Sequence, residues 1–331
     1  MLYFRMDFKH FTAGQNDNDR RLDRVLRNFL RDENLSSIYK ALRKGFIKVN
    51  GKKAEASSRI REGDDIQIAS FLIENNSEKS KDSGVNSKHK SQQDCFNLKL
   101  DEITVFKNDY ILILNKPYDI SVQPSDSDKS PALSQIVQKQ YEKTHQKASL
   151  SFKTGPLHRL DRKTTGLLAF SQNLEGAKWF SEAIKKHTVQ KIYLAVLEGK
   201  LTKKEVWEDE IAKRENTEQK FHTVTVNSSQ KGKAAYSEVR PLKHAVFEGK
   251  EITLAQVLIK TGRTHQIRSQ CAYHGFPLLG DTAYGGSKIK QNNYGKDFFL
   301  HAEELHFPQN NPLNLPETII APEPDFLNLF Y

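Results

Sequence analysis

The chain has 331 residues, with 51 basic and 41 acidic side chains and a formal net charge of +10. A hydrophobic content of 37% is enough for folded cores, and the length favours two domains. No stretch reaches the roughly 20 apolar residues of a membrane span, and the N-terminus lacks the apolar segment of a signal peptide. The two cysteines, Cys95 and Cys271, are widely spaced, so we expect neither a disulfide nor a metal site. This cysteine usage is typical of a reducing, cytoplasmic compartment. The positive charge favours a polyanionic partner.

The first 70 residues predict a small module of helices and strands. Residues 2–12 alternate in polarity, as an edge strand does, and residues 13–19 are turn-like. From Arg20 apolar residues recur at helical spacing, and a second helix is expected to begin at Ser36 and to end at Gly45. Asn50 and Gly51 predict a hairpin turn, and a strand over 66–69 completes the module.

Residues 20–70 hold 13 basic and 7 acidic side chains, a net charge of +6 that is over half of the chain's surplus. The segments "RLDRVLRNFL", "YKALRKGFIKVNGKKA" and "REGDDIQI" resemble the S-four domain, a small RNA-binding module. The resemblance implies contacts to the RNA backbone, which contribute affinity more than sequence readout. The alternative is a solvated basic face on an ordinary subdomain. The residues expected to contact RNA are Arg24, Arg27, Lys40, Arg43, Lys44 and Lys52.

A polar segment separates this module from the rest of the chain. Residues 74–94 contain a single aliphatic residue, Val85, so they cannot offset the entropy of ordering. We therefore predict four parts: an N-terminal strand or tail (1–19), the RNA-binding module (20–70), a flexible linker (71–98) and a second domain (99–331).

The second domain is predicted to be α+β, with helices and loops flanking a mostly antiparallel mixed sheet. A turn at Asn108 and Asp109 precedes a buried strand, and "GLLAFSQN" is a further strand followed by a helix that Asn173 caps. "KIYLAVLEGK" and "ITLAQVLIK" predict strands, and a short helix between Thr264 and His274 ends at Gly275. No phosphate-binding glycine loop and no zinc motif occurs.

One aspartate in this domain stands out. In "GPLHRLDRKTTGLLAFSQN", Asp161 lies between Arg159 and Arg162. Neighbouring guanidinium groups favour the ionised carboxylate, which suits either a structural ion pair or a nucleophile or proton acceptor. Glycoside hydrolysis requires a second carboxylate, but the next acid, Glu175, lies within a predicted helix.

Five ordered blocks resemble the RluA-type pseudouridine synthases. They are "LNKPYDISVQP", "HRLDRKTTGLL", "KIYLAVLEG", "IKTGRTHQIRSQCAYHGFPLLGDTAYGG" and "FLHAEELHF". The resemblance spans about residues 100–310 and implies that the chain isomerises uridine in RNA.

The resemblance implies roles for individual residues. Asp161 would be the catalytic carboxylate, whether it attacks the sugar, attacks the base or abstracts a proton. Tyr193 would stack on the extruded uracil and assist proton removal, although by itself it also fits a core aromatic. Arg263 would pair with Asp161 and hold it ionised. Arg159 would fill the gap left by the flipped nucleotide, and His158 would support the Asp161 loop.

The same resemblance places four more residues around the substrate. Lys260 and Arg268 would bind phosphates or the rim of the base, although Arg268 also fits a polar helix exterior. Leu160 and Ile267 would form walls of the pocket.

The sequence thus predicts an RNA pseudouridine synthase that needs no cofactor or metal and acts as a monomer away from membranes. Ribosomal RNA is the favoured substrate, and transfer RNA stays open. Two alternatives are a non-catalytic RNA-binding or ribosome-assembly protein, and a base-excising glycosidase that would release free uracil.

Overall fold

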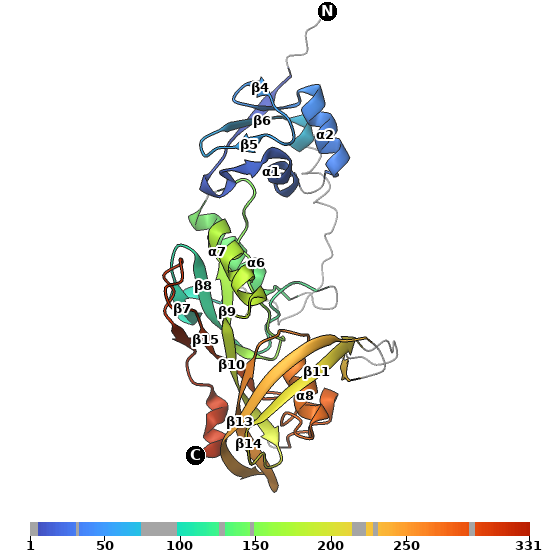
Figure 1. Ribbon diagram of the computed structural model, residues 1–331. Coiled ribbons are helices and arrows are strands. Elements are labelled where there is room, and N and C mark those ends of the chain that lie inside the picture. Colours follow the sequence, from blue (N-terminus) through green and yellow to red (C-terminus); the bar gives the residue numbers. More distant parts are fainter. Residues whose placement is uncertain are drawn as a thin grey trace, which may run out of the picture. The chain divides into compact units, whose positions relative to one another are not determined.

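A computed structural model describes residues 6–30, 33–73, 98–125, 130–145, 149–213, 223–227, 231–290 and 295–331. The chain divides into two compact units, Met1–Gln93 with Val137–Thr154, and Asp94–Ile136 with Gly155–Tyr331 (Figure 1). The predicted linker core, 74–94, lies outside the described residues, as do Arg31 and Cys95. No helix among the described residues is long and apolar enough to span a membrane.

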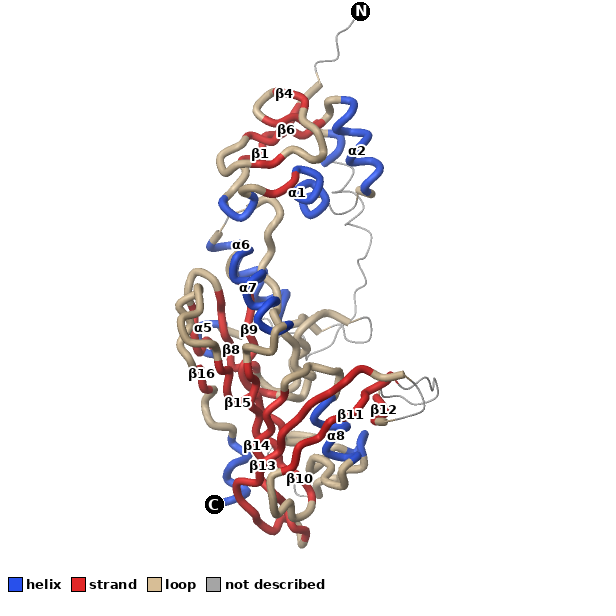
Figure 2. The backbone as a smooth tube through the Cα atoms, viewed as in Figure 1, coloured by secondary structure: helices blue, strands red, loops and turns tan. Residues whose placement is uncertain are grey.

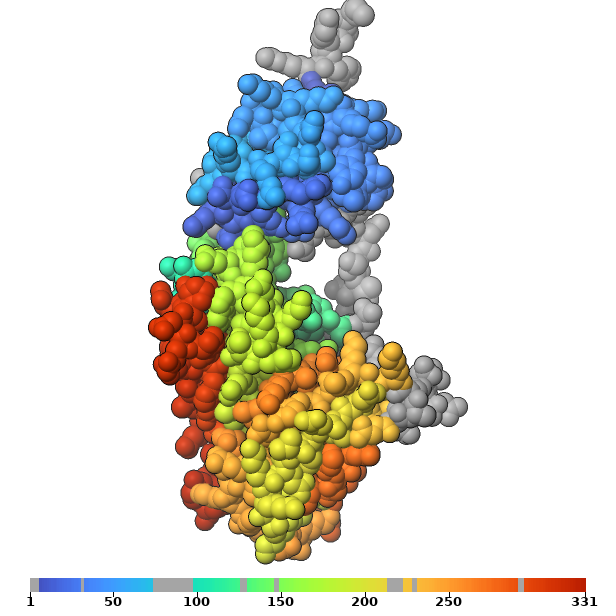
Figure 3. Space-filling view, viewed as in Figure 1, coloured from blue at the N-terminus to red at the C-terminus, as the bar shows by residue number. Residues whose placement is uncertain are grey.

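The N-terminal part of the first unit contains two short helices beside a four-stranded sheet of order β1-β6-β3-β4, and Figure 3 shows its described residues in blue as a closely packed body. The expected N-terminal edge strand is confirmed, because β1 pairs with β6 at the end of this sheet. The elements are β1 (Phe8–Thr12), η1 (Gln15–Asp17), β2 (Arg20–Arg21), α1 (Leu22–Phe29), α2 (Leu35–Lys44), β3 (Ile47–Val49), β4 (Lys52–Lys53), β5 (Arg59–Ile60) and β6 (Asp65–Ala69).

Local sequence signals explain most boundaries of this unit. Gly45 ends α2 in the left-handed region at φ 74°, and Asn50 and Gly51 take φ 50° and 76° in the β3–β4 hairpin, as predicted. The expected cap at Ser36 is wrong. Asn34 caps α2, because its side chain accepts a hydrogen bond from the Ser37 N–H at 2.8 Å, and Ser36 Oγ donates to the same oxygen.

A buried aspartate ties a later segment of the chain into the first unit. Asp17 is fully buried and accepts hydrogen bonds from the backbone N–H groups of Gly14, Leu150 and Ser151. The hydroxyl groups of Ser149 and Ser151 donate to the same carboxylate. Residues 13–19 are therefore more than the polar turn that the sequence predicts.

The second unit is built on a ten-stranded sheet of order β12-β11-β13-β14-β10-β15-β9-β8-β7, with β16 paired to β15. It confirms the predicted α+β class with a mostly antiparallel mixed sheet, since only the β9–β15 pairing among the described strands is parallel. The strands are β7 (Thr104–Lys107), β8 (Ile111–Lys116), β9 (Thr165–Ser171), β10 (Gln190–Glu198), β11 (Glu205–Lys213), β12 (Val224–Val226), β13 (Lys233–Phe247), β14 (Lys250–Ile259), β15 (Leu300–His306) and β16 (Thr318–Ile320).

Helices cover parts of this sheet. Helix α7 lies against β9, and α8 lies against β11 and β12 (Figure 2). Asn173 caps α7 by accepting from the Gly176 N–H at 2.8 Å, as predicted, and Gly275 follows α8 at φ 87°. The helical elements are α5 (Leu100–Ile103), α7 (Leu174–Lys185), α8 (Gln266–Tyr273), η2 (Thr282–Tyr284) and η3 (Asp325–Phe330). Helix α6 (Leu133–Thr144) begins in this unit, and its residues from Val137 on are grouped with the first.

The parallel pairing of β9 with β15 depends on a glycine. Gly166 has φ 102°, and a Cβ atom at this position would lie 2.2 Å from the carbonyl oxygen of Ala302. No side chain fits there. The Thr-Thr-Gly sequence after Asp161 thus fixes the aspartate's loop directly onto the centre of the sheet.

Candidate active site

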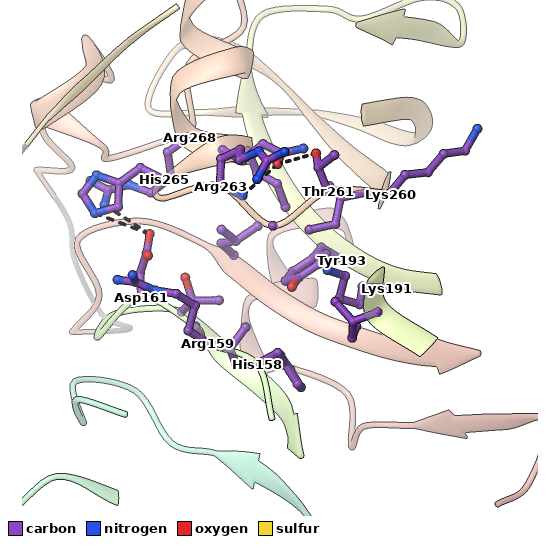
Figure 4. A pocket seen from close by; sticks show the side chains of 18 of the residues that line it. His158, Arg159, Asp161, Lys191, Tyr193, Lys260, Thr261, Arg263, His265 and Arg268 are labelled. Atoms are coloured by element: carbon purple, nitrogen blue, oxygen red, sulfur yellow. Dashed lines mark hydrogen bonds and ion pairs between the residues drawn. The ribbon is translucent and has the colours of Figure 1, made fainter. Parts of the chain in front are cut away.

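A cavity of about 460 Å³ opens in the second unit where the loop before β9 meets β10, the loop after β14 and the start of α8. Its lining includes Asp161, Tyr193, Arg263, His265 and Arg268, which approach from different elements (Figure 4). Segments that are far apart in the sequence therefore meet around Asp161.

The loop that carries Asp161 is held by neighbouring strands. Lys116, at the end of β8, is fully buried, and its ammonium group donates to the carbonyl oxygens of Pro117, Ile120 and Arg162 at 2.8–2.9 Å. Burial lowers the pKa of Lys116 to about 7, yet three acceptors satisfy all three N–H bonds of the protonated form. The Asp161 carbonyl accepts from the Thr164 N–H at 3.1 Å, which closes the turn.

The structure places Arg268, and not Arg263, beside Asp161. Arg268 Nη1 lies 3.4 Å from Asp161 Oδ2, and the carboxylate is 18% exposed. Arg263 instead donates its Nε hydrogen to the carbonyl of Ala234 at 2.8 Å. The expected Asp161–Arg263 ion pair is absent from the described residues, and Arg162, the other flanking arginine, pairs with Asp119 at 2.9 Å. Arg268 lies in the first turn of α8 and contacts Asp161, whereas Arg263 precedes the helix.

Arg268 is held rigidly for this contact. Its guanidinium group makes two hydrogen bonds to Asp281, at 2.6 and 2.9 Å, and lies 4.6 Å from the ring centre of Phe298 and 5.0 Å from that of Tyr284. Burial opposes its charge, but the bond to Asp281 and the charges of Asp281 and Asp161 raise the pKa of Arg268. Arg268 is therefore buried, lines the cavity and pairs with carboxylates, whereas the sequence interpretation had it bind phosphates or the rim of the base.

His265 is a second neighbour of Asp161, at 3.9 Å from Nε2 to Oδ2. The Val224 N–H donates to Tyr284 Oη at 3.0 Å, and Tyr284 Oη lies 2.8 Å from His265 Nδ1. Burial raises the pKa of Tyr284 to about 12, so its O–H remains and donates to Nδ1. Burial also lowers the pKa of His265. The neutral imidazole then carries its proton on Nε2, which faces Asp161.

Tyr193 comes from β10 and forms a wall of the cavity. It is 5% exposed, and burial together with the charge of Asp161 raises the pKa of its phenol well above the ordinary value. The phenol is therefore protonated at neutral pH and offers an aromatic face, not a base. Leu160 and Ile267 are 7% and 5% exposed and line the same cavity, where the sequence placed them.

Three further predicted residues lie along the cavity. His158 accepts a hydrogen bond from the Ala169 N–H at 3.1 Å, and burial lowers its pKa to about 3, so it is a neutral support for the loop. Arg159 is exposed and has no partner among the described residues. Lys260 extends away from Asp161 (Figure 4), and its ammonium group lies 3.8 Å from the ring centre of Tyr236.

The basic residues assigned to RNA contact all belong to the first unit. Every one is exposed, and none forms an ion pair within the part of the chain that the structure describes. They lie on α1 (Arg24, Arg27), α2 (Lys40, Arg43, Lys44) and β4 (Lys52).

The sequence interpretation missed several residues of the site. His265, Asp281 and Tyr284 all lie within the long block from 259 to 286, but their mutual contacts depend on tertiary structure. Lys191 lines the cavity from β10 and is 6% exposed. A lysine at the start of an otherwise apolar strand could have been found by the conflict between its charge and the burial of its neighbours.

Two family models match the chain. One, described as RNA pseudouridylate synthase, covers residues 110–273, and one described as S4 domain covers residues 20–66. Asp161, Tyr193 and Arg268 lie in the first, and the exposed basic residues of α1 and α2 lie in the second.

Curated relatives match over most of the chain. Ribosomal large subunit pseudouridine synthase C of Rickettsia bellii (strain RML369-C) is 30% identical over 290 residues, which are 86% of this chain and 88% of that protein. The protein of the same name from Vibrio parahaemolyticus serotype O3:K6 is 29% identical over 312 residues, 92% and 89% of the two chains. Human RNA pseudouridylate synthase domain containing 1 shares the fold with a TM-score of 0.54 at 24% identity, over 68% of this chain and 85% of that chain. The chain therefore belongs to the RNA pseudouridylate synthase family.

Proposed function

We propose that the protein isomerises uridine to pseudouridine in large-subunit ribosomal RNA, with Asp161 as the reacting carboxylate. The observation that carries this proposal is the Asp161 carboxylate in a cavity beside Arg268, with the Tyr193 ring in the same lining. The names of the relatives from Rickettsia and Vibrio support large-subunit ribosomal RNA as the substrate.

The arrangement suits this chemistry. Isomerisation breaks the bond from N1 of the base to C1′ of the ribose and forms a bond from C5 to C1′. The proton on C5 leaves, and N1 gains a proton, so no redox partner or cofactor is needed. An ionised Asp161 supplies the negative charge for attack or proton transfer, and the Tyr193 ring holds the free base while it rotates. Arg268 orients the carboxylate through its contact at 3.4 Å.

The test uses purified protein and a large-subunit ribosomal RNA transcript with tritium at C5 of uridine. The wild-type protein should release tritium to water and form pseudouridine, and Asp161→Asn should reduce this rate at least about 1,000-fold while RNA affinity stays within about threefold. Asp109→Asn, at an exposed aspartate outside the cavity, is the matched control and should retain activity. If Asp161→Asn retained activity, Asp161 would not be the reacting carboxylate. Release of free uracil would indicate a glycosidase.

The choice of RNA is part of the same proposal. Ribosomal and transfer RNA transcripts should be compared at equal concentration, and preferential modification of transfer RNA would replace the ribosomal assignment. We also propose that the protein acts as a monomer in the cytoplasm, without a metal. Sedimentation at assay concentration tests the monomer, fractionation of cells tests the compartment, and activity in the presence of a chelator tests metal independence.

A further inference from the structure

The ammonium group of Lys191 is the feature of the cavity that the proposed mechanism does not use. Lys191 and Tyr193 alternate with Ile192 on β10, so both side chains leave the same face of the strand, and both line the cavity (Figure 4). Lys191 is 6% exposed. The ammonium group of Lys191 is therefore the next side chain on that face of β10 after the Tyr193 ring, which we propose stacks on the base.

Lys191 has no acceptor within the described part of the chain. No carboxylate oxygen lies within 4.0 Å of its ammonium nitrogen, and no hydrogen bond is formed. Lys116 shows what a satisfied buried lysine looks like in the same unit, because three carbonyl oxygens accept its three N–H bonds. The ammonium group of Lys191 instead lines the cavity, where a ligand can reach it.

The surroundings of Lys191 add positive charge. Burial and then the charge of Arg263 lower the pKa of Lys191 to about 8, and Lys191 in turn helps to lower the pKa of His158. The nitrogen lies 3.4 Å from the point that a Cβ atom at Gly262 would occupy, so the glycine leaves room beside the ammonium. The ammonium group thus lines the cavity with room beside it and a positive neighbour, so a negatively charged ligand would be favoured there.

We propose that Lys191 binds a backbone phosphate of the RNA next to the nucleotide whose base lies on Tyr193. The side chains of residues i and i+2 of a strand are about 6.6 Å apart, which is comparable with the span from the base to the phosphate of one nucleotide. A phosphate supplies the negative charge and the several acceptor oxygens that an ammonium group requires. That the ligand is RNA rests on the proposed function. The lack of a protein acceptor for Lys191 among the described residues does not depend on it.

The first experiment compares Lys191→Met with Lys107→Met, which makes the same substitution at an exposed strand lysine outside the cavity. Lys191→Met should raise the Kd for a large-subunit ribosomal RNA fragment about tenfold. It should also reduce the slope of log K against log salt by about 0.7–0.9, the change expected for one phosphate contact. Its melting temperature should stay close to that of the wild-type protein, because the ammonium group makes no hydrogen bond or ion pair within the described residues. Lys107→Met should leave both the Kd and the salt slope unchanged.

A lower melting temperature with an unchanged salt slope would show that Lys191 is a structural residue and would overturn the proposal. Lys191→Gln provides a second neutral variant if the methionine variant does not fold, and it should lose the same salt dependence. These readouts need no turnover, so a failure of the proposed isomerisation would be seen separately, as absence of pseudouridine with the wild-type protein.

A neutralised phosphate identifies the ligand. Methylphosphonate linkages are placed singly on either side of the target uridine in an RNA oligonucleotide. One of them should weaken binding of the wild-type protein about tenfold and leave Lys191→Met unaffected. An equal loss in both proteins at both linkages would overturn the phosphate assignment. It would also be overturned if a uracil analogue that lacks one carbonyl weakened binding of the wild-type protein but not of Lys191→Met.

Discussion

At the scale of single residues, the site is organised by arginine geometry. Arg268 contacts Asp161 with one nitrogen while its other nitrogens bind Asp281. A planar guanidinium can make both contacts at once, whereas an ammonium group cannot reproduce that fork. The charge next to Asp161 is thus fixed in position before substrate arrives.

We expect Arg268→Lys to reduce kcat about 100-fold, because the lysine loses the two-point contact with Asp281 and with it the orientation toward Asp161. Arg263→Lys is the matched control, since Arg263 binds a backbone carbonyl through a single N–H. Single-turnover rates, measured with protein in excess of RNA and above Kd, separate chemistry from binding. Equal losses of kcat in the two variants would contradict the assignment of Arg268 as the partner of Asp161.

The tautomer of His265 gives a second prediction. Tyr284→Phe removes the hydroxyl that donates to His265 Nδ1, so protonation of that nitrogen becomes easier and the pKa of His265 rises. The charged groups around His265 are Asp161, Asp281, Arg268 and Arg159, and all of them remain. As the pH drops, activity of Tyr284→Phe should therefore be lost at a higher pH than activity of the wild-type protein.

The measurement is the pH profile of kcat/KM for the two proteins. Tyr273→Phe, at an exposed tyrosine of α8, should keep the wild-type profile. Coincident acid limbs for wild type and Tyr284→Phe would show that this hydroxyl does not set the protonation of His265.

Residue types at the site could be predicted from the sequence, but their pairing could not. Asp161, Tyr193, Leu160 and Ile267 all line the cavity as expected. The choice between Arg263 and Arg268 depends on the backbone at His265, which takes φ 51° as α8 begins. Histidine adopts the left-handed conformation more often than most residues but still only in a small minority of cases, so the sequence alone does not predict it at His265.

At the scale of elements, the turns could be predicted from the sequence, but the buried hydrogen-bonding role of Asp17 could not. Gly45 and the Asn50-Gly51 pair act locally, so the chain around them determines the turn. Asp17 lies in a polar stretch that is typical of an exposed loop, but its partners come from residues 149–151, far along the chain. A sequence window around Asp17 contains no sign of those donors.

We expect Asp17→Ala to destabilise the first unit by about 3 kcal/mol or more, because several buried donors lose their acceptor together. Asp19→Ala is the control, since its side chain is 80% exposed and pairs only with an exposed arginine. Hydrogen exchange of the β1 and β6 amides measures the loss. Unchanged protection in Asp17→Ala would contradict the anchoring role.

At the scale of the whole molecule, the concentration of basic charge in residues 20–70 could be predicted. Neither the grouping of residues 137–154 with the first unit nor the strand order could. Charge density and the polar linker are properties of composition. The central position of β10, between β14 and β15, arises from pairings such as Tyr193 with Val257 and with Ala302. Such long-range pairings depend on the competition among many apolar strands of similar composition.

The buried histidines of the second unit predict its stability toward acid. Burial lowers the pKa of His158 to about 3 and that of His301 to about 4, both below the ordinary value of 6.5. Between these values the unfolded chain binds protons that the folded chain does not, so stability falls as the pH drops from about 6.5 toward 4. The carboxylates of Asp209 and Glu238, whose pKa values are lowered, contribute in the same direction but only below their ordinary values of 3.8 and 4.5.

His301→Asn isolates one of these contributions. Asparagine can keep the hydrogen bond that links His301 Nδ1 to Thr165 Oγ1 at 2.8 Å, but it removes the titrating group. Urea unfolding between pH 7 and 4.5 can be followed by tryptophan fluorescence, because Trp179 and Trp207 both belong to the second unit. The slope of unfolding free energy against pH should decrease by up to about 1.4 kcal/mol per pH unit in His301→Asn. His187→Asn, at an exposed imidazole of the same unit, should leave the slope unchanged, and an unaltered slope in His301→Asn would show that burial does not suppress the ionisation of His301.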